Sequence, residues 1–106
     1  MLDELVRHVI IMGLEVRDPV RYSLYCARMR PILTAYGGRF VYDFVVSEVI
    51  ESPTEAEINR VCSLSFPSPA DKEAFFADRA HQRLLAELYE PAVVSTTLIG
   101  AYEGPS

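Results

Sequence analysis

The two halves of this chain repeat one order of elements: an apolar run, a capped helix start and a second apolar run. Asp18-Pro19 follows the apolar residues 8–16 in the first half, and Ser68-Pro69 follows residues 61–66 in the second. Asp and Ser side chains accept hydrogen bonds from a first helical turn, and a proline at the first helical position has no N–H to leave unpaired. The resulting order, βαββαβ, predicts an α+β, ferredoxin-like sandwich in which two helices cover one face of a four-stranded antiparallel sheet.

The size of the chain indicates one domain, residues 1–106. It has 106 residues, of which 50% are hydrophobic and 24% charged, as in ordinary globular domains. A chain this short buries only about 60–65% of the surface that its unfolded form exposes. Any sheet face that it cannot cover itself is therefore a reason to associate.

Charge and apolar patterning exclude two classes of partner. A net charge of −5 argues against nucleic-acid binding, which needs clustered Lys and Arg to neutralise phosphates. Residues 1–7 include Asp3 and Glu4, and 18 apolar residues never run together, so we expect no signal peptide, no membrane span and a cytoplasmic location. Cys26 and Cys62 lack C-x-x-C spacing and suit a reducing compartment, where they pack as small apolar side chains.

Helical periodicity is clear in the first half and interrupted in the second. The first helix should begin at Pro19, bend at Pro31 and end at Gly37-Gly38, because proline opposes a carbonyl of the preceding turn and glycine accepts positive φ. Residues 78–81 weaken the apolar pattern of the second helix, and we expect a break there. The spacing predicts one buried stripe on the first helix: Tyr22, Tyr25, Met29, Ile32 and Tyr36.

Two strands carry apolar side chains on both faces. The first strand, residues 8–16, alternates between two largely apolar sets, and so does the expected second strand, residues 39–50, which should direct Phe40, Tyr42, Phe44 and Val46 to one face. Two helices cover only one side of a four-stranded sheet, so the other side must meet something else. A second copy is the simplest partner, and we predict a homodimer whose facing sheets form a barrel with a small-molecule pocket near the interface.

Several short motifs make this chain similar to one known family. It resembles the domain of unknown function 1330 family, within the dimeric α/β-barrel superfamily, over about residues 8–102. The motifs are Tyr22-x-x-Tyr25, the late-helix Pro31, Gly37-Gly38-Arg39, and Phe66-Pro67-Ser68 followed by Ala74-Phe75-Phe76.

The resemblance implies a ferredoxin-like homodimer but does not select a reaction. The superfamily includes cofactor-free monooxygenases, lactone isomerases and haem-dependent enzymes, together with many small members of unknown activity. Similar proteins commonly place a tyrosine after the second helix, where this chain has Ala80-His81-Gln82. A role assumed for that tyrosine does not transfer to His81.

Three residues are candidates for catalysis. His81, one turn after Asp78, has the pKa range of a proton shuttle, although a histidine at a helix break also caps carbonyls. Asp43 and Glu15 interrupt apolar strand faces, where a carboxylate should be paired or have a raised pKa. If both face the barrel they are the expected acid/base pair, and if they face solvent at an edge they only discourage aggregation. Tyr25 lies on the buried stripe, where core packing is the alternative to chemistry.

Further polar residues are candidates for ligand binding. Arg39 follows the double glycine and suits a carboxylate or phosphate-like anion, the alternative being an ion pair with a glutamate. Arg28 belongs to a helix that carries three arginines, which form either a cationic spot or a solvated face. The other predicted ligand-binding residues are Tyr22, Tyr42 and Glu15.

The motifs of common cofactor-dependent enzymes do not occur. The chain has no Walker loop, nucleotide-binding glycine fingerprint, Ser-His-Asp order or zinc-ligand spacing, so we predict neither cofactor nor metal. Two hypotheses remain. One is a homodimer that binds a small, mostly apolar molecule, with a monooxygenase- or isomerase-like activity if it is an enzyme; the other is a non-catalytic structural or regulatory interaction module.

Overall fold

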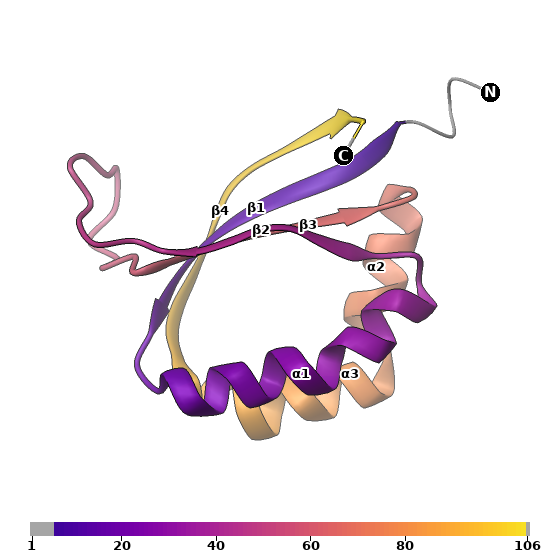
Figure 1. Ribbon diagram of the computed structural model, residues 1–106, viewed down its shortest axis with the longest axis horizontal. Helices are drawn as coiled ribbons and strands as arrows, with labels where there is room; N and C mark the ends of the chain where they lie inside the picture. Colours follow the sequence, from indigo (N-terminus) through magenta and orange to yellow (C-terminus); the bar gives the residue numbers. More distant parts are fainter. Residues whose placement is uncertain (1–5, 106) are drawn as a thin grey trace.

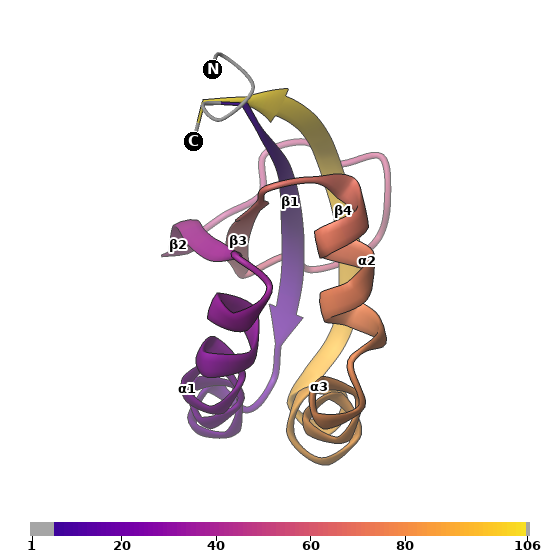
Figure 2. The same ribbon diagram turned by 90° about the vertical axis from the view of Figure 1, so that its right-hand side faces the viewer.

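Helices cover one face of a four-stranded sheet and leave the other face bare (Figures 1 and 2). The computed structural model describes residues 6–105. The predicted α+β, ferredoxin-like fold is confirmed. In chain order the elements are β1 (Arg7–Val16), α1 (Pro19–Ala35), β2 (Arg39–Val45), β3 (Arg60–Phe66), α2 (Pro69–Ala77), α3 (Arg79–Leu84), the π-helix η2 (Leu85–Tyr89), α4 (Glu90–Ala92) and β4 (Val93–Gly104).

The sheet has the order β2-β3-β1-β4, and every neighbouring pair is antiparallel. The first strand of each half therefore lies at the centre of the sheet. In β1, Ile10 and Leu14 face the helices and join the core, together with Leu64 and Phe66 of β3. Figure 2 shows α1 beside α3, with α2 above α3. In the part of the chain that the structure describes, no helix is long and apolar enough to cross a membrane.

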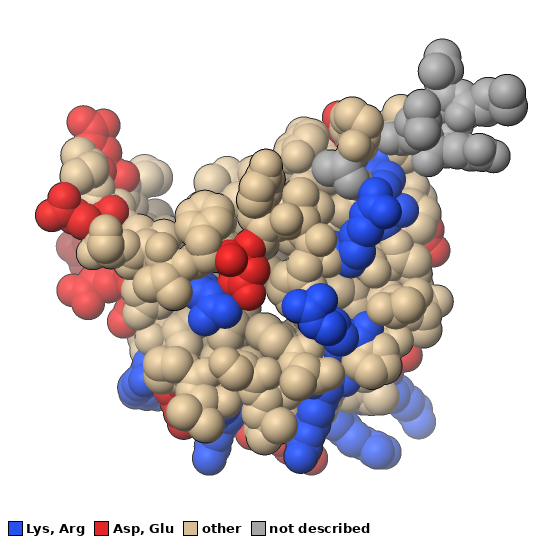
Figure 3. All heavy atoms as spheres, viewed as in Figure 1, with Lys and Arg blue, Asp and Glu red and all other residues tan. Residues whose placement is uncertain are grey.

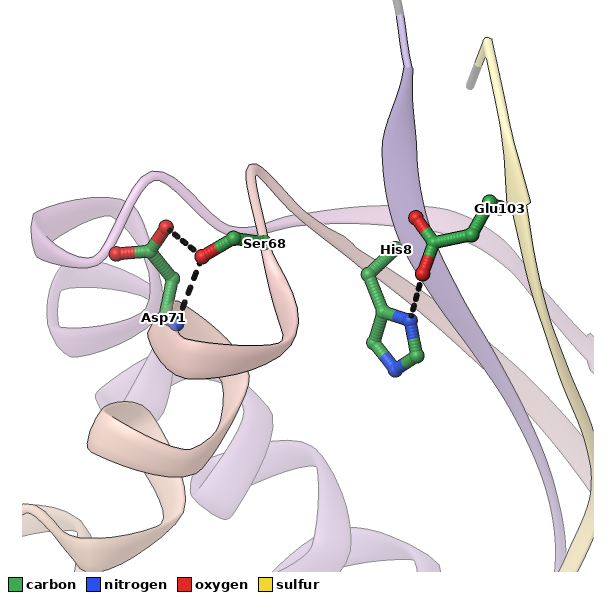
Figure 4. A network of polar contacts seen from close by, with 4 residues as sticks. All are labelled: His8, Ser68, Asp71 and Glu103. Carbon is green, nitrogen blue, oxygen red and sulfur yellow. Dashed lines mark hydrogen bonds and ion pairs between the residues drawn. The ribbon is translucent and has the colours of Figure 1, made fainter. Parts of the chain in front are cut away.

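Both predicted helix starts are capped by the expected side chains. Asp18 Oδ1 accepts a hydrogen bond from the Arg21 N–H at 3.0 Å. Ser68 Oγ accepts from the Asp71 N–H at 3.1 Å and donates to the Asp71 carboxylate at 2.7 Å (Figure 4). These bonds satisfy N–H groups that a first turn otherwise leaves unpaired.

The buried stripe of α1 differs from the prediction at its C-terminal end. Tyr22, Tyr25 and Met29 are buried as expected, but the fourth buried residue is Leu33, which is 1% exposed. Ile32 is only half-buried, and so is Tyr36. Three turns of helix span about 10.8 residues, so a stripe that begins at Tyr22 returns to Leu33.

Strand β2 is shorter than predicted, and a β-bulge divides its apolar residues between the two faces. The strand ends at Val45 rather than at residue 50. Its register against β3 shifts between Phe40 and Tyr42, so that Phe40 packs against the core while Tyr42 is 63% exposed. The extra residue of a bulge reverses the alternation that follows it. The prediction that Phe40, Tyr42 and Phe44 share one face was therefore wrong.

The bare face of the sheet carries large apolar side chains. Tyr42 and Phe44 of β2 and Ile99 and Tyr102 of β4 are all exposed. At one end the connection 46–59 folds back over this face and brings the Ile58 side chain onto Gly13, where a Cβ would lie 2.6 Å from Ile58 Cδ1. Figure 3 shows acidic side chains gathered on this connection, at the end of the molecule.

Replacing Gly37 by alanine should destabilise the turn between α1 and β2. Gly37 has φ +73°, and a Cβ there would lie 2.7 Å from Pro67 Cγ. We expect Gly37→Ala to lower the free energy of unfolding by about 1–2 kcal/mol, because left-handed backbone and a close contact both penalise a side chain. Urea denaturation at fixed protein concentration measures the change. Gly100→Ala is the control, since nothing lies within 4 Å of its added Cβ; equal effects of the two substitutions would contradict this account.

Candidate site between the sheet and the helices

A cavity of about 150 Å³ lies between the helices and the covered face of the sheet. None of the described residues that line it is charged. Thr96 is exposed whereas the other lining residues are buried or half-buried, so the cavity meets solvent at Thr96. The lining residues are Met12, Leu14, Tyr22, Tyr25, Met29, Cys62, Leu64, Phe76, Leu85, Tyr89 and Thr96.

A hydrogen bond between Tyr25 and His81 lies behind this cavity. The Tyr25 hydroxyl lies 2.7 Å from His81 Nε2, which joins α1 to α3. His81 is 0% exposed, and its ring stacks on Phe75 with the ring centres 4.0 Å apart. Its other nitrogen, Nδ1, lies 3.1 Å from the Phe75 carbonyl oxygen. Both ring nitrogens therefore have partners in a dry environment.

The Phe75 carbonyl determines the direction of this chain of hydrogen bonds. A carbonyl oxygen only accepts, so Nδ1 carries a proton and donates it. In a neutral imidazole the other nitrogen is then an acceptor, and Tyr25 donates its hydroxyl proton to His81 Nε2. Burial lowers the pKa of His81 and raises that of Tyr25. Both shifts keep the proton on the phenol.

The break between α2 and α3 positions His81. Asp78 ends α2 and caps α3, and its Oδ1 accepts a hydrogen bond from the His81 N–H at 3.0 Å. Its other oxygen accepts from the Tyr36 hydroxyl at 2.7 Å, which ties the end of α1 to the same turn. The Tyr36 hydrogen bond, followed by that from the His81 backbone, lowers the pKa of the Asp78 carboxyl. The predicted helix break is thus a capped turn that aims His81 back at Phe75.

Asp43 does not join His81, because an arginine holds it. Arg60 makes two hydrogen bonds to the Asp43 carboxylate, of 2.7 and 3.0 Å, and its guanidinium carbon lies 5.0 Å from the centre of the Tyr22 ring. The pKa of Tyr22 is raised, mainly because its hydroxyl is buried. Asp43 and Arg60 therefore flank the tyrosine cluster as a neutralised pair.

The predicted acidic pair is not brought together. Asp43 lies opposite Cys62, whose side chain is in the core on the helix side. Glu15 alternates with Leu14 onto the other side of β1, where its carboxylate accepts the Glu57 N–H at 3.3 Å. The sheet separates the two carboxylates.

Of the other predicted ligand-binding residues, only Tyr22 lines the cavity. Arg39 is opposite Ser65 at the start of β2, near Arg7, whose pKa is lowered by burial and by the Arg39 charge. Arg28 is exposed on α1, and Tyr42 is exposed on the bare face.

Two important lining residues were missed at the sequence level. Tyr89 and Thr96 hydrogen-bond to each other at 2.5 Å beside the mouth of the cavity. Tyr89 stands four residues after Leu85, the spacing of one helical face, and that spacing was the available signal. The sequence holds no such signal for Thr96, because its strand has threonine and serine on both sides.

A second hollow lies on the bare face. A groove of about 420 Å³ runs between the connection 46–59 and β4, with Val49, Ile58, Val61 and Ile99 among its lining residues. Within residues 6–105, His, Cys, Asp and Glu side chains form no group of three that would hold a metal ion. His8 of β1 is not among the residues that line the cavity, and its Nδ1 lies 2.9 Å from Glu103 Oε1 (Figure 4).

One known protein family matches nearly the whole chain. The family model described as a domain of unknown function, DUF1330, matches residues 8–102. The chain belongs to this family. The resemblance noted from the motifs is thereby confirmed. No curated protein matches the chain.

Solved structures with the same fold have diverse descriptions. A protein of unknown function from Rhodopseudomonas palustris, RPA0582, has 18% identity and a TM-score of 0.72, with 93% of this chain and 82% of that one covered. A dimeric ferredoxin-like protein of unknown function from Thermobifida fusca has 10% identity and a TM-score of 0.56, covering 95% and 92%. SnoaB, a cofactor-independent oxygenase from Streptomyces nogalater, has 13% identity and a TM-score of 0.56, covering 92% and 89%. Identities this low show a shared fold alone.

The buried state of His81 predicts a pH-dependent stability. Its pKa is lowered in the folded protein, whereas in the unfolded chain it is about 6.5. Neutral His81 thus makes its full contribution to the free energy of unfolding above pH 6.5. As the pH falls from 6.5 towards the pKa of the folded protein, this contribution is lost by at most about 1.4 kcal/mol per pH unit. Denaturation between pH 5.5 and 7.5 measures this slope, and NMR titration of His81 measures the pKa itself.

A matched pair of variants assigns the slope to one histidine. His81→Asn should flatten it, whereas His8→Asn should leave the His81 part in place. A folded-state pKa for His81 at or above 6.5 would contradict the interpretation.

Proposed function

We propose that this protein is a homodimer that binds a small, largely apolar organic molecule in the cavity of each protomer. The observation that carries the proposal is the uncharged cavity, whose wall includes three tyrosines, one of them hydrogen-bonded to a fully buried histidine. Ligand sites in proteins are mostly apolar with a few polar groups at fixed positions. Tyr25 and His81 supply such a fixed polar group.

The size of the cavity supports occupation by a small molecule. Protein interiors pack as densely as organic crystals, with few voids larger than water. A volume of about 150 Å³ accommodates a benzene-sized molecule. The rings of Tyr22, Tyr25 and Tyr89 offer large apolar surfaces to such a ligand.

The bare face of the sheet supports the dimer. Tyr42, Phe44 and Ile99 expose apolar surface on a face that no helix covers, and a two-fold interface needs one such self-complementary patch. The Thermobifida fusca neighbour of the same fold is described as dimeric. The groove on this face would then lie at the interface, as the sequence predicted for a pocket, whereas the tyrosine-lined cavity lies across the sheet from it.

Any reaction at this site would be acid–base chemistry by Tyr25 and His81 without a cofactor. The cofactor-independent oxygenase among the structural neighbours has this fold. Asp43 forms an ion pair with Arg60 and would take no part in this chemistry. In the alternative, a non-catalytic structural or regulatory module, the bare face serves assembly and the cavity binds nothing.

Small neutral ring compounds should stabilise the protein. We expect benzene or toluene to raise the Tm by several degrees, because a ligand at about 100 times its Kd adds about 2.7 kcal/mol to stability. Thr96→Phe should abolish the shift by filling the mouth of the cavity, and Thr96→Ser should preserve it. No stabilisation of the parent protein by any neutral ring probe would refute the binding proposal and favour the interaction module.

A charge on the bare face should break the dimer. Phe44 is 49% exposed, so Phe44→Glu leaves the protomer intact but places a carboxylate in the proposed interface. Val20→Glu, at an 82% exposed position on α1, is the matched control. Sedimentation velocity should find dimers of the parent protein and of Val20→Glu, and monomers of Phe44→Glu. A monomeric parent protein at micromolar concentration would contradict the proposed homodimer.

A further inference from the structure

The direction of the Tyr25–His81 hydrogen bond determines what Tyr25 offers to the cavity. Because His81 Nδ1 donates to the Phe75 carbonyl, the Tyr25 hydroxyl gives its only proton to His81 Nε2. A phenol oxygen that has donated its proton still has lone pairs that accept. Towards the cavity, Tyr25 is therefore an acceptor and not a donor.

Two other phenols, those of Tyr22 and Tyr89, line the wall. Tyr22 lies beside Arg60, whose guanidinium carbon is 5.0 Å from the centre of the Tyr22 ring. Tyr89 and Thr96 bond to each other at the mouth. Of the phenols in the wall, Tyr25 is the one whose proton is committed to a buried partner by the contacts of the structure, and this leaves its oxygen as an acceptor for a bound molecule.

We propose that the cavity selects a neutral, single-ring molecule with one hydroxyl, a phenol or a cyclic alcohol of similar size, whose O–H donates to the Tyr25 oxygen. This inference rests on the proposed function and names its ligand class. The volume limits the ligand to one ring, and the wall of uncharged residues opposes a carboxylate or an ammonium, whose desolvation nothing there would offset.

The hydroxyl is recognised because it would otherwise lose its hydrogen bonds to water. A buried donor without an acceptor weakens binding by the full free energy of its desolvation. A donor that meets the Tyr25 oxygen regains a hydrogen bond. In a wholly apolar cavity of this size, benzene should therefore bind more tightly than phenol. Preference for phenol is the signature of the Tyr25 acceptor.

Calorimetric titration with phenol, benzene and fluorobenzene tests the inference on the full-length protein. Fluorobenzene has nearly the shape of phenol but donates no hydrogen bond. We expect phenol to bind about five- to tenfold more tightly than either of the other probes, as one net hydrogen bond would give. Benzene binding with no preference for phenol overturns this inference and leaves the proposed function standing. If none of the three binds to the folded protein, both fail.

Two variants assign the preference to Tyr25. Tyr25→Phe should abolish it while fluorobenzene still binds, because the new ring keeps its place in front of the imidazole. Tyr89→Phe removes the phenol hydroxyl at the mouth of the cavity and should leave the preference unchanged. Loss of the preference in Tyr89→Phe, or its persistence in Tyr25→Phe, would overturn the assignment.

A measurement on the parent protein keeps the test independent of variant folding. The ¹⁵N chemical shifts of His81 distinguish an imidazole protonated at Nδ1 from one protonated at Nε2. We expect the Nδ1-protonated form, free and with phenol bound. An Nε2-protonated ring would make Tyr25 a donor towards the cavity and would overturn the inference.

Discussion

The buried hydrogen bond between Tyr25 and His81 is the contact on which the helical layer and the site both depend. It joins α1 to α3 over 2.7 Å at a place without solvent, and the Phe75 carbonyl holds the imidazole from behind. In such surroundings a charged tyrosinate–imidazolium pair would be penalised by desolvation, while a neutral pair with every proton committed is stable. The Tyr25–His81 pair is therefore polarised but neutral, and the proposed recognition of a ligand hydroxyl rests on this state.

The two faces of the sheet differ because the helices cover only one of them, while β1 and β2 carry apolar side chains on both. On one face, Ile10 and Leu14 pack under the helices, and three tyrosines line the cavity. On the other face, Tyr42 and Phe44 are exposed. The proposed ligand binding and the proposed assembly would thus use opposite sides of one layer, and a substitution on the bare face would change assembly without altering the cavity.

The sequence was sufficient for the fold but only partly for the site. Caps such as Asp18 and Ser68, and glycines such as Gly37, act within a few residues, so their spacing predicts the elements directly. The bulge in β2 has no comparable local signature, and missing it placed Phe40 and Tyr42 on the same face. His81 and Tyr25 were both named as candidates, yet their contact spans 56 residues and depends on how α3 packs on α1. Tyr89 and Thr96 escaped notice because only tertiary packing brings them to the cavity.

Two irregularities of the second helical region give the site its shape. The capped turn at Asp78 ends α2 one residue before α3 begins, which lets His81 reach back to Phe75 instead of continuing along a straight helix. The π-helix η2 then widens the backbone from Leu85 to Tyr89 and directs both side chains into the cavity wall. π-Helical turns cost regular hydrogen bonding and occur frequently at functional sites. An uninterrupted α-helix over this region would preserve the ferredoxin-like fold but would lose the histidine contact and the place of Tyr89 in the wall, so the proposed site depends on these departures from regular structure rather than on the fold itself.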